Sequence, residues 1–277
     1  MEPFSDDRDL LTPTHLYLLG AGVSFPEHLT LQSLEILSTC NRICSNLPQS
    51  ELDALPENLR AKCVSLWPLY QENRNRSENY GDVAQAVLDA VAAEPPVAWM
   101  TPGHPLIFDS VSQTLLESGR ARGLNVRVVP GISCLDTILA EIGYDPAGGL
   151  LVYEATSLVM GGLPLMPAMG TLILQPSAFG SDLTHYSTEW TPDLAPLRDH
   201  LLQFFEAKHR CAFVRSYSQF SGPAQVHWRE LGDLTSISFN AVAGSTLFLP
   251  PAAVDRKSAF DEGQATGTQG SAPYPVG

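Results

Sequence analysis

Short apolar segments alternate with amphipathic ones through the first half of the chain, and this alternation restricts the fold more than any other feature. Residues 15–20, 97–101 and 126–129 are apolar runs of strand length, and apolar positions recur at helical spacing over residues 83–91. The order strand, helix, strand requires right-handed crossovers and predicts a mainly parallel sheet. The chain of 277 residues is therefore expected to have an α/β fold.

The same periodicity predicts the other elements. Leu31 opens the apolar stripe of a helix over residues 31–37, and Ser77 is a candidate N-cap for the helix that contains residues 83–91. The remaining expected elements are a strand at residues 63–66, a helix around 111–116, a helix at 135–142, strands at 150–153 and 171–175, a helix at 197–208, and strands at 212–216 and 245–249.

Changes in composition indicate how the chain is divided. Pro130 and Gly131 are the expected hinge between an N-terminal α/β domain at residues 13–129 and a C-terminal α/β domain at residues 130–251. The acidic residues 1–12 and the Gly-, Ala- and Ser-rich residues 252–277 are expected to be disordered.

The net charge of the chain limits the kinds of molecule that it is expected to bind. A net charge of −14 argues against binding to nucleic acid or to an anionic membrane surface, both of which require clustered Lys and Arg. It suits a cationic ligand, although acidity also serves solubility alone. The five cysteines show no metal-ligand spacing, and the start of the chain lacks a signal peptide, so we expect a cytoplasmic protein without a metal site.

Gly20 and Gly22 follow the first strand, but Phe25 occupies the third glycine position of a dinucleotide-binding loop. A tight turn out of the strand is the simpler interpretation, and a nicotinamide enzyme is disfavoured.

Several segments together resemble the tetrapyrrole methylases. They are residues 18–22 (LLGAG) with 26–30 (PEHLT), 103–105 (GHP) with Ile107 and Phe108, and 129–133 (VPGIS). This resemblance implies two α/β domains with S-adenosylmethionine folded in the cleft between them. The implication is physically reasonable because ligands of open α/β sheets lie beyond the carboxyl ends of strands, where residues 102–105 and 130–133 are expected.

A narrower resemblance is to the borosin peptide backbone α-N-methyltransferases. It rests on Tyr70, Arg76 and Tyr80, on Gly-His-Pro in place of Gly-Asp-Pro, and on Gln175 and Ser245–Thr246. The resemblance implies that Tyr70, Arg76 and Tyr80 are catalytic. It implies cofactor contacts at Pro102, Gly103, His104, Ile107, Phe108, Ser133, Cys134, Gln175, Ser245 and Thr246, with S-adenosylhomocysteine as product.

Amide methylation would need these side chains. A peptide nitrogen is planar and barely nucleophilic because its lone pair is delocalised into the carbonyl. A tyrosinate can remove its proton if a nearby cation lowers the tyrosine pKa, and Arg76 could be that cation or an oxyanion donor.

Structural interpretations stay open for each residue. Tyr70 could be a packing residue, Arg76 a solvated charge, Tyr80 a side chain at a domain edge, and His104 a turn residue. Pro102 stands where the borosin pattern has a tyrosine, which puts activity itself in question.

The resemblance also bears on partners. It implies a homodimer, as in the family. We expect a separate precursor peptide as substrate, because residues 252–277 are too short for the helical clasp of the fused relatives and lack their Val- and Ile-rich core; methylation of this tail is the lesser alternative. Two other functions remain: a small-molecule methylase acting on a tetrapyrrole-like macrocycle, and a non-catalytic relative that binds cofactor or precursor.

Overall fold

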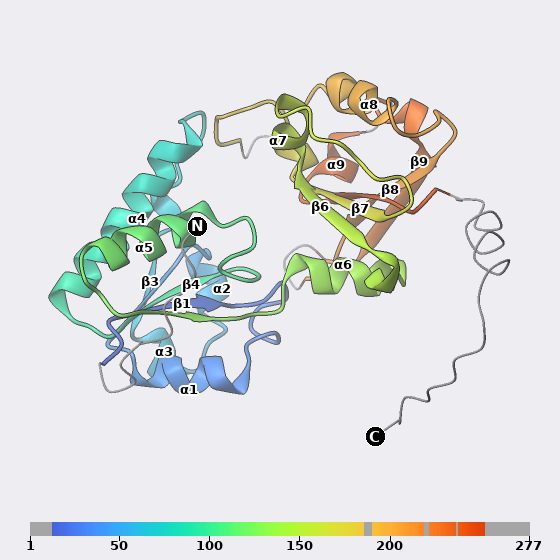
Figure 1. The fold of residues 1–277 in the computed structure, drawn as a ribbon. Helices are drawn as coiled ribbons and strands as arrows, with labels where there is room; N and C mark the ends of the chain where they lie inside the picture. The colour runs from blue at the N-terminus through green and yellow to red at the C-terminus, as the bar shows by residue number, and fades with distance from the viewer. Residues whose placement is uncertain (1–12, 186–189, 219–221, 237, 253–277) are drawn as a thin grey trace, which may run out of the picture.

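Two sheets joined by a short connection make up the structure, a computed structural model that describes residues 13–185, 190–218, 222–236 and 238–252 (Figure 1). The disorder expected at residues 1–12 and 253–277 lies outside the described residues. Ala252, the first residue of the expected tail, donates its backbone N–H to the Pro167 carbonyl at 2.7 Å.

The first sheet is parallel throughout, in the order β3-β2-β4-β1-β5. Its strands are β1 (Leu16–Gly20), β2 (Arg42–Ser45), β3 (Cys63–Ser65), β4 (Val97–Thr101) and β5 (Val126–Val129). Together with the helices that cover it, this sheet forms what we call the first unit. The expected α/β fold and parallel sheet are confirmed.

Helices cover both faces of the first sheet. On one face lie α4 (Arg76–Ala93) and α5 (Ser110–Ala121), and on the other α1 (Leu31–Thr39), α2 (Gln49–Leu52) and α3 (Glu57–Arg60). Trp99 of β4 is fully buried under α4 and α5 and donates its indole N–H to the Ser112 hydroxyl at 3.0 Å. Its neighbour Met100 packs in the opposite core. Burial on both faces explains why β4 reads as a continuous apolar run.

The second sheet is mixed, in the order β6-β7-β10-β8-β9, with only β6 and β7 parallel. Its strands are β6 (Leu150–Glu154), β7 (Gly170–Leu174), β8 (Arg210–Arg215), β9 (Gln225–Glu230) and β10 (Thr246–Leu249). One face carries α6 (Cys134–Ile142), and the other carries α7 (Ala155–Met160), α8 (Ala195–Leu201) and α9 (Phe239–Val242). These elements form the second unit. The domain boundary expected at Pro130 and Gly131 stays a prediction; it falls between β5 and α6.

Several local predictions are wrong. The N-cap of α4 is Asn75, whose side-chain oxygen accepts the Ser77 N–H at 2.9 Å, so Ser77 lies inside the helix. Leu31 is 87% exposed because it lies in the first turn of α1, on the side away from the core. The helix expected at residues 197–208 ends at Leu201.

Two strands were not predicted, β2 and β9. β2 has four residues and begins with Arg42, and β9 is an edge strand of mostly polar residues, so neither shows a clear apolar pattern. Within the described residues, no helix combines the length and the apolar character that crossing a bilayer requires.

Gly20 and Gly131 allow the end of β1 and the loops after β4 and β5 to touch backbone to backbone. A Cβ atom on Gly20 would lie 2.4 Å from the Gly103 carbonyl oxygen and 2.7 Å from the Gly131 nitrogen. A Cβ atom on Gly131 would lie 2.5 Å from the same Gly103 oxygen. Real Cβ atoms do not approach this closely, so these positions require glycine.

Gly131→Ala tests this contact between the loops. The added methyl group meets backbone atoms that cannot rotate away, so we expect a loss of about 1–3 kcal/mol in the free energy of unfolding, measured by urea denaturation. Gly148→Ala is the control, because nothing lies within 4 Å of its Cβ position. Equal unfolding free energies for the two variants would contradict the close packing of the loops.

Candidate functional site

Tyr80, in the second turn of α4, lines three neighbouring cavities. The polar cavity, of about 740 Å³, lies between α4, α5 and the second unit, and contains Arg76, Asp109, Glu154, Gln175 and Asp182. The aromatic cavity, of about 470 Å³, contains Trp67, Tyr70, Leu183, His185 and Trp190. The small cavity, of about 240 Å³, contains Asn46, Tyr70, Pro102, Ile107 and Phe108. Tyr80 is therefore the side chain at which all three spaces meet.

Aromatic rings from both units surround one side of Tyr80. The ring of Tyr70 meets the ring of Tyr80 edge-on, with 6.1 Å between centroids, and Trp67 lies 6.0 Å from Tyr70. Across the aromatic cavity His185 stacks on Trp190 with centroids 4.4 Å apart. Tyr70 and Tyr80 also pack partly buried against the core under α4. Tyr70 and Tyr80 therefore pack against the core and also line the cavities.

Arg76 is the first residue of α4 and contacts the second unit. Its backbone N–H donates to the Asp182 carbonyl at 2.7 Å, and its guanidinium donates to the Ser181 carbonyl. The side chain lines both the polar and the aromatic cavity. Hydrogen bonds therefore fix the charged side chain of Arg76 between the two units, and Arg76 is not a solvated loop residue.

The pKa of Tyr80 reflects opposing influences. Burial raises it most, the charge of Arg76 lowers it, the carboxylate of Asp109 raises it, and a side-chain hydrogen bond with Arg76 lowers it again. The balance leaves the pKa of Tyr80 above its ordinary value. Arg76 acts in the expected direction, but burial outweighs it.

Backbone strain is found beside these cavities. Asn73, Phe108 and Gln175 adopt φ values of 59°, 55° and 56°, in the left-handed region that L-residues rarely occupy. Phe108 and Gln175 line the polar cavity, and Asn73 lies in the loop before α4. Strained residues of this kind tend to cluster at ligand sites, so their position supports this cleft as a functional one.

The predicted cofactor residues fall into two groups. Pro102, Ile107 and Phe108 line the small cavity, and Phe108 and Gln175 line the polar cavity. The others, which line none of these three cavities, are Gly103, His104, Ser133, Cys134, Ser245 and Thr246.

Local contacts account for several residues of the second group. The Nδ1 atom of His104 accepts the Leu106 N–H at 3.1 Å, which is the turn role considered above. Burial lowers the pKa of His104, while the nearby carboxylate of Asp136 raises it. Ser133 caps α6 and exchanges hydrogen bonds with Asp136. Ser245 is buried and donates to the Val242 carbonyl at 2.7 Å.

Sequence reasoning missed several cavity residues. Asn46 follows β2 directly and lines the aromatic and small cavities, with a buried side-chain oxygen that has no hydrogen-bond partner. Predicting β2 would have indicated Asn46, because it lies at the carboxyl end of a parallel strand. His185 and Trp190 carry no pattern that would have identified them.

Metal and thiol chemistry find no support in the part of the chain that the structure describes. No group of three or more His, Cys, Asp or Glu side chains there could hold a metal ion. The five cysteines form no disulfides, and burial raises the pKa of Cys40 to about 11 and that of Cys211 to about 12, so neither is a reactive thiolate.

Comparison with known sequences identifies relatives over much of the chain. The family described as Tetrapyrrole (Corrin/Porphyrin) Methylases matches residues 15–219. A "Methyltransferase/ribosomally synthesized type I borosin cyclic peptide precursor" of Coprinopsis marcescibilis is 28% identical over 166 residues, which cover 60% of this chain and 42% of the relative. A protein of the same description from Cerrena unicolor is 25% identical over 240 residues, covering 85% and 58%. The chain spans about half the length of these relatives.

Solved structures share the fold. The methyltransferase CobJ superposes with a TM-score of 0.60 at 16% identity, covering 87% of this chain and 95% of that one. Uroporphyrin-III C-methyltransferase from Thermus thermophilus, in complex with S-adenosyl homocysteine, gives 0.55 at 18% identity, covering 85% and 96%. At these identities the likeness concerns the fold alone.

The opposing influences on Tyr80 can be separated by titration. Arg76→Gln removes the cation and should raise the pKa of Tyr80 further, whereas Asp109→Asn removes the anion and should lower it. Asparagine can still cap α5 at position 109, so the helix is expected to remain. The phenolate absorbance of each variant is measured against the same variant carrying Tyr80→Phe. Shifts in the same direction would contradict the electrostatic account.

Proposed function

Because the chain belongs to the tetrapyrrole methylase family of S-adenosylmethionine-dependent methyltransferases, we propose that it methylates backbone amide nitrogens of a ribosomally made precursor peptide. Sequence relatives whose names join a methyltransferase to a borosin cyclic peptide precursor support the peptide substrate. The observation that carries the proposal is Tyr80, a half-buried phenol at the junction of three cavities, beside a guanidinium that hydrogen bonds hold in place.

Methylation of an amide nitrogen has a chemical requirement that Tyr80 and Arg76 can fulfil. The nitrogen must lose its proton for its lone pair to become available, so a base has to lie within hydrogen-bond reach. In the proposed reaction the ionised Tyr80 oxygen would take up the amide N–H proton, and the nitrogen would bond to the methyl carbon as the bond between that carbon and the sulfonium sulfur breaks, which gives the N-methylated peptide, neutral Tyr80 and S-adenosylhomocysteine. Arg76 favours the tyrosinate beforehand and stabilises negative charge on the substrate carbonyl oxygen during transfer.

The cofactor fits the residues around the cavities. Both the polar and the aromatic cavity have volumes typical of ligand sites. Asp109, Glu154 and Asp182 give the polar cavity an excess of carboxylates over the single Arg76 guanidinium, which suits a positively charged ligand. When bound, S-adenosylmethionine would supply an electrophilic methyl group on a sulfonium. Phe108 and Gln175, whose strained backbone needs compensation, are the candidate contacts on the two sides of the cleft.

Tyr70 has a supporting part in the proposed reaction. Its ring packs edge-on against Tyr80 and limits how the phenol can turn. Pro102 lines the small cavity with both tyrosines, so the place that the borosin pattern gives to another tyrosine is here a smaller, apolar side chain. Among the residues that the structure describes, Tyr70 and Tyr80 are the phenols that line these cavities.

A macrocycle substrate is less compatible with this site. Tetrapyrrole-like macrocycles carry several carboxylates, and the polar cavity already holds Asp109, Glu154 and Asp182. Like charges at such a site would oppose binding. The separate precursor and the homodimer implied by the resemblance are part of the proposal.

Tyr80→Phe tests the proposed base. We expect peptide methylation to slow by about 10²–10⁴-fold because the proton acceptor is lost, while cofactor binding measured by calorimetry stays unchanged. The enzyme is expressed with short neighbouring reading frames, and methyl groups are counted by mass spectrometry of the peptides. Tyr17→Phe is the matched control, since Tyr17 packs under the opposite face of the first sheet.

Each outcome of this experiment has a distinct meaning. Normal methylation by Tyr80→Phe would overturn the role of Tyr80. Methyl groups found only within residues 252–277 would replace the separate precursor by the chain's own tail. Cofactor binding by the wild-type protein without methylation of any peptide would favour the non-catalytic relative.

A further inference from the structure

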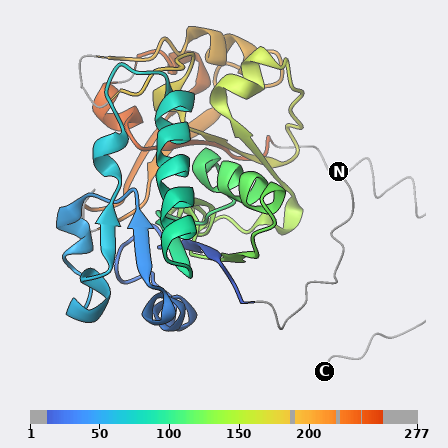
Figure 2. The ribbon, with the colours of Figure 1, turned by 90° about the vertical axis from the view of Figure 1, so that its left-hand side faces the viewer.

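The entrance to α4 is joined to the second unit by backbone hydrogen bonds. The Asn73 N–H donates to the Thr184 carbonyl at 2.8 Å, the Thr184 N–H to the Arg74 carbonyl at 2.9 Å, and the Arg76 N–H to the Asp182 carbonyl at 2.7 Å. Asn75 and Leu183 pair as an antiparallel bridge between these bonds. Figures 1 and 2 show the chain between β7 and α8 reaching the upper end of α4 at this point. We call residues 73–76 and 182–184 the clasp strands.

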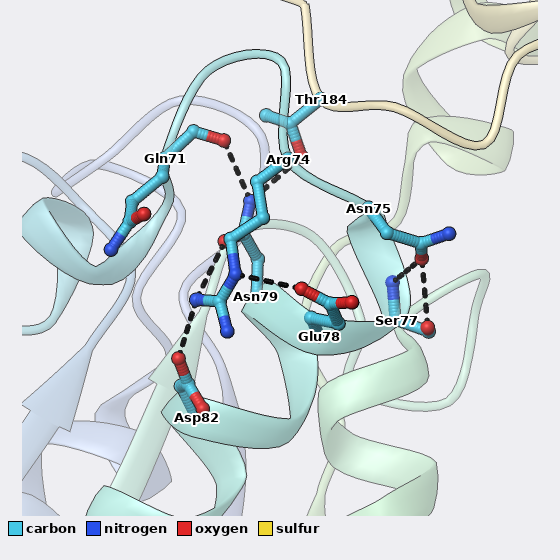
Figure 3. Close-up of polar contacts among 8 residues, drawn as sticks. All are labelled: Gln71, Arg74, Asn75, Ser77, Glu78, Asn79, Asp82 and Thr184. Atoms are coloured by element: carbon cyan, nitrogen blue, oxygen red, sulfur yellow. Dashed lines mark hydrogen bonds and ion pairs between the residues drawn. The ribbon is translucent and has the colours of Figure 1, made fainter.

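Asn79 binds the clasp strands to the helix. Its side chain is completely buried, and its Nδ2 donates to the Gln71 carbonyl and to the Thr184 hydroxyl, both at 2.9 Å (Figure 3). Its Oδ1 accepts from Arg74 at 3.4 Å. One amide therefore connects α4, the loop before it and the second unit.

The exposed ion pairs nearby do not substitute for this amide. Arg74 pairs with Glu78 at 3.0 Å and with Asp82 at 2.5 Å, and both carboxylates are more than half exposed. Water and salt screen such pairs, so they contribute little. The Asn79 amide has no access to water, and breaking its hydrogen bonds leaves polar groups unpaired inside the protein.

The position of Asn79 links it to the candidate site. Asn79 directly precedes Tyr80 and lies one helical turn after Arg76. On one side it holds Gln71, the residue after Tyr70; on the other it holds Thr184, in the segment that supplies carbonyl partners to Arg76. Breaking the hydrogen bonds of the Asn79 amide would therefore loosen the segments that position Tyr70 and Arg76 beside Tyr80.

We propose that Asn79 is a positioning residue that holds Arg76 against Tyr80 by fixing the clasp strands between the two units. Its effect on methyl transfer rests on the proposed function, whereas its effect on Tyr80 does not. Loss of the Asn79–Thr184 bond loosens the carbonyl groups that hold the Arg76 guanidinium. The phenol then loses part of the influence that favours its ionised form.

Thr184→Val tests the proposal with little change in volume. It removes the hydroxyl that accepts from Asn79, and we expect kcat to fall about tenfold, equivalent to about 1.4 kcal/mol, with cofactor affinity unchanged. The ascending limb of the pH–rate profile, on which the rate rises as the Tyr80 base ionises, should shift to higher pH, and so should the phenolate titration of Tyr80 measured on the protein alone. Thr184→Ser, which keeps the hydroxyl, should restore both. Asn79→Ala should show the same shifts more strongly, with folding checked by circular dichroism.

Thr171→Val is the matched control, because Thr171 is fully buried and its hydroxyl has no hydrogen-bond partner. It should leave the rate and both titrations unchanged. A slower Thr184→Val enzyme with an unshifted Tyr80 titration would overturn the proposal, as would wild-type rates in this variant. If the wild-type protein methylates no peptide, the proposed function fails, while the phenolate titration still decides the role of Asn79.

Discussion

The contact between the start of α4 and residues 181–184 is the constraint on which the candidate site depends. Without it, Arg76 would be a charge at an exposed helix end, where solvent weakens its influence on any neighbour. With it, the guanidinium is held by the Ser181 carbonyl beside the half-buried phenol of Tyr80. The second unit therefore does more than line the cleft, since it fixes the position of a charged side chain, Arg76, that belongs to the first unit.

The electrostatics of Tyr80 follow from the same arrangement. Burial makes a phenol harder to ionise, which by itself disfavours a tyrosinate base. The same burial strengthens the effect of each nearby charge, because fewer water molecules separate the groups. Arg76 and Asp109 thus change the pKa of Tyr80 in opposite directions. A site of this kind is tuned by the precise placement of a few charges, and a cationic cofactor in the cleft would add one more in the direction of Arg76.

How far the sequence predicts the molecule depends on how local each feature is. β4 and β5 were predicted to the residue because burial on both faces leaves an uninterrupted apolar run. Tyr70, Arg76 and Tyr80 lie within one short segment, so a family resemblance could indicate them together. The segment that holds Arg76 comes from far along the chain, and its contacts are made through backbone carbonyls, which carry no residue-type signal. Asn79 was likewise missed, since a buried amide on a helix reads in sequence as one more polar position.

In this fold, the substrate has to be determined by side chains of the site and not by the shared arrangement of helices and strands. Solved structures with the same fold are named as methyltransferases of uroporphyrin-III and precorrin compounds, whereas the sequence relatives are named for peptide precursors. An amide nitrogen needs a base beside it, and among the described residues it is the segment from Tyr70 to Tyr80 that brings phenols and a guanidinium to the cavities. That segment is held by the clasp strands, so the proposed peptide chemistry depends on the contact that joins the two units.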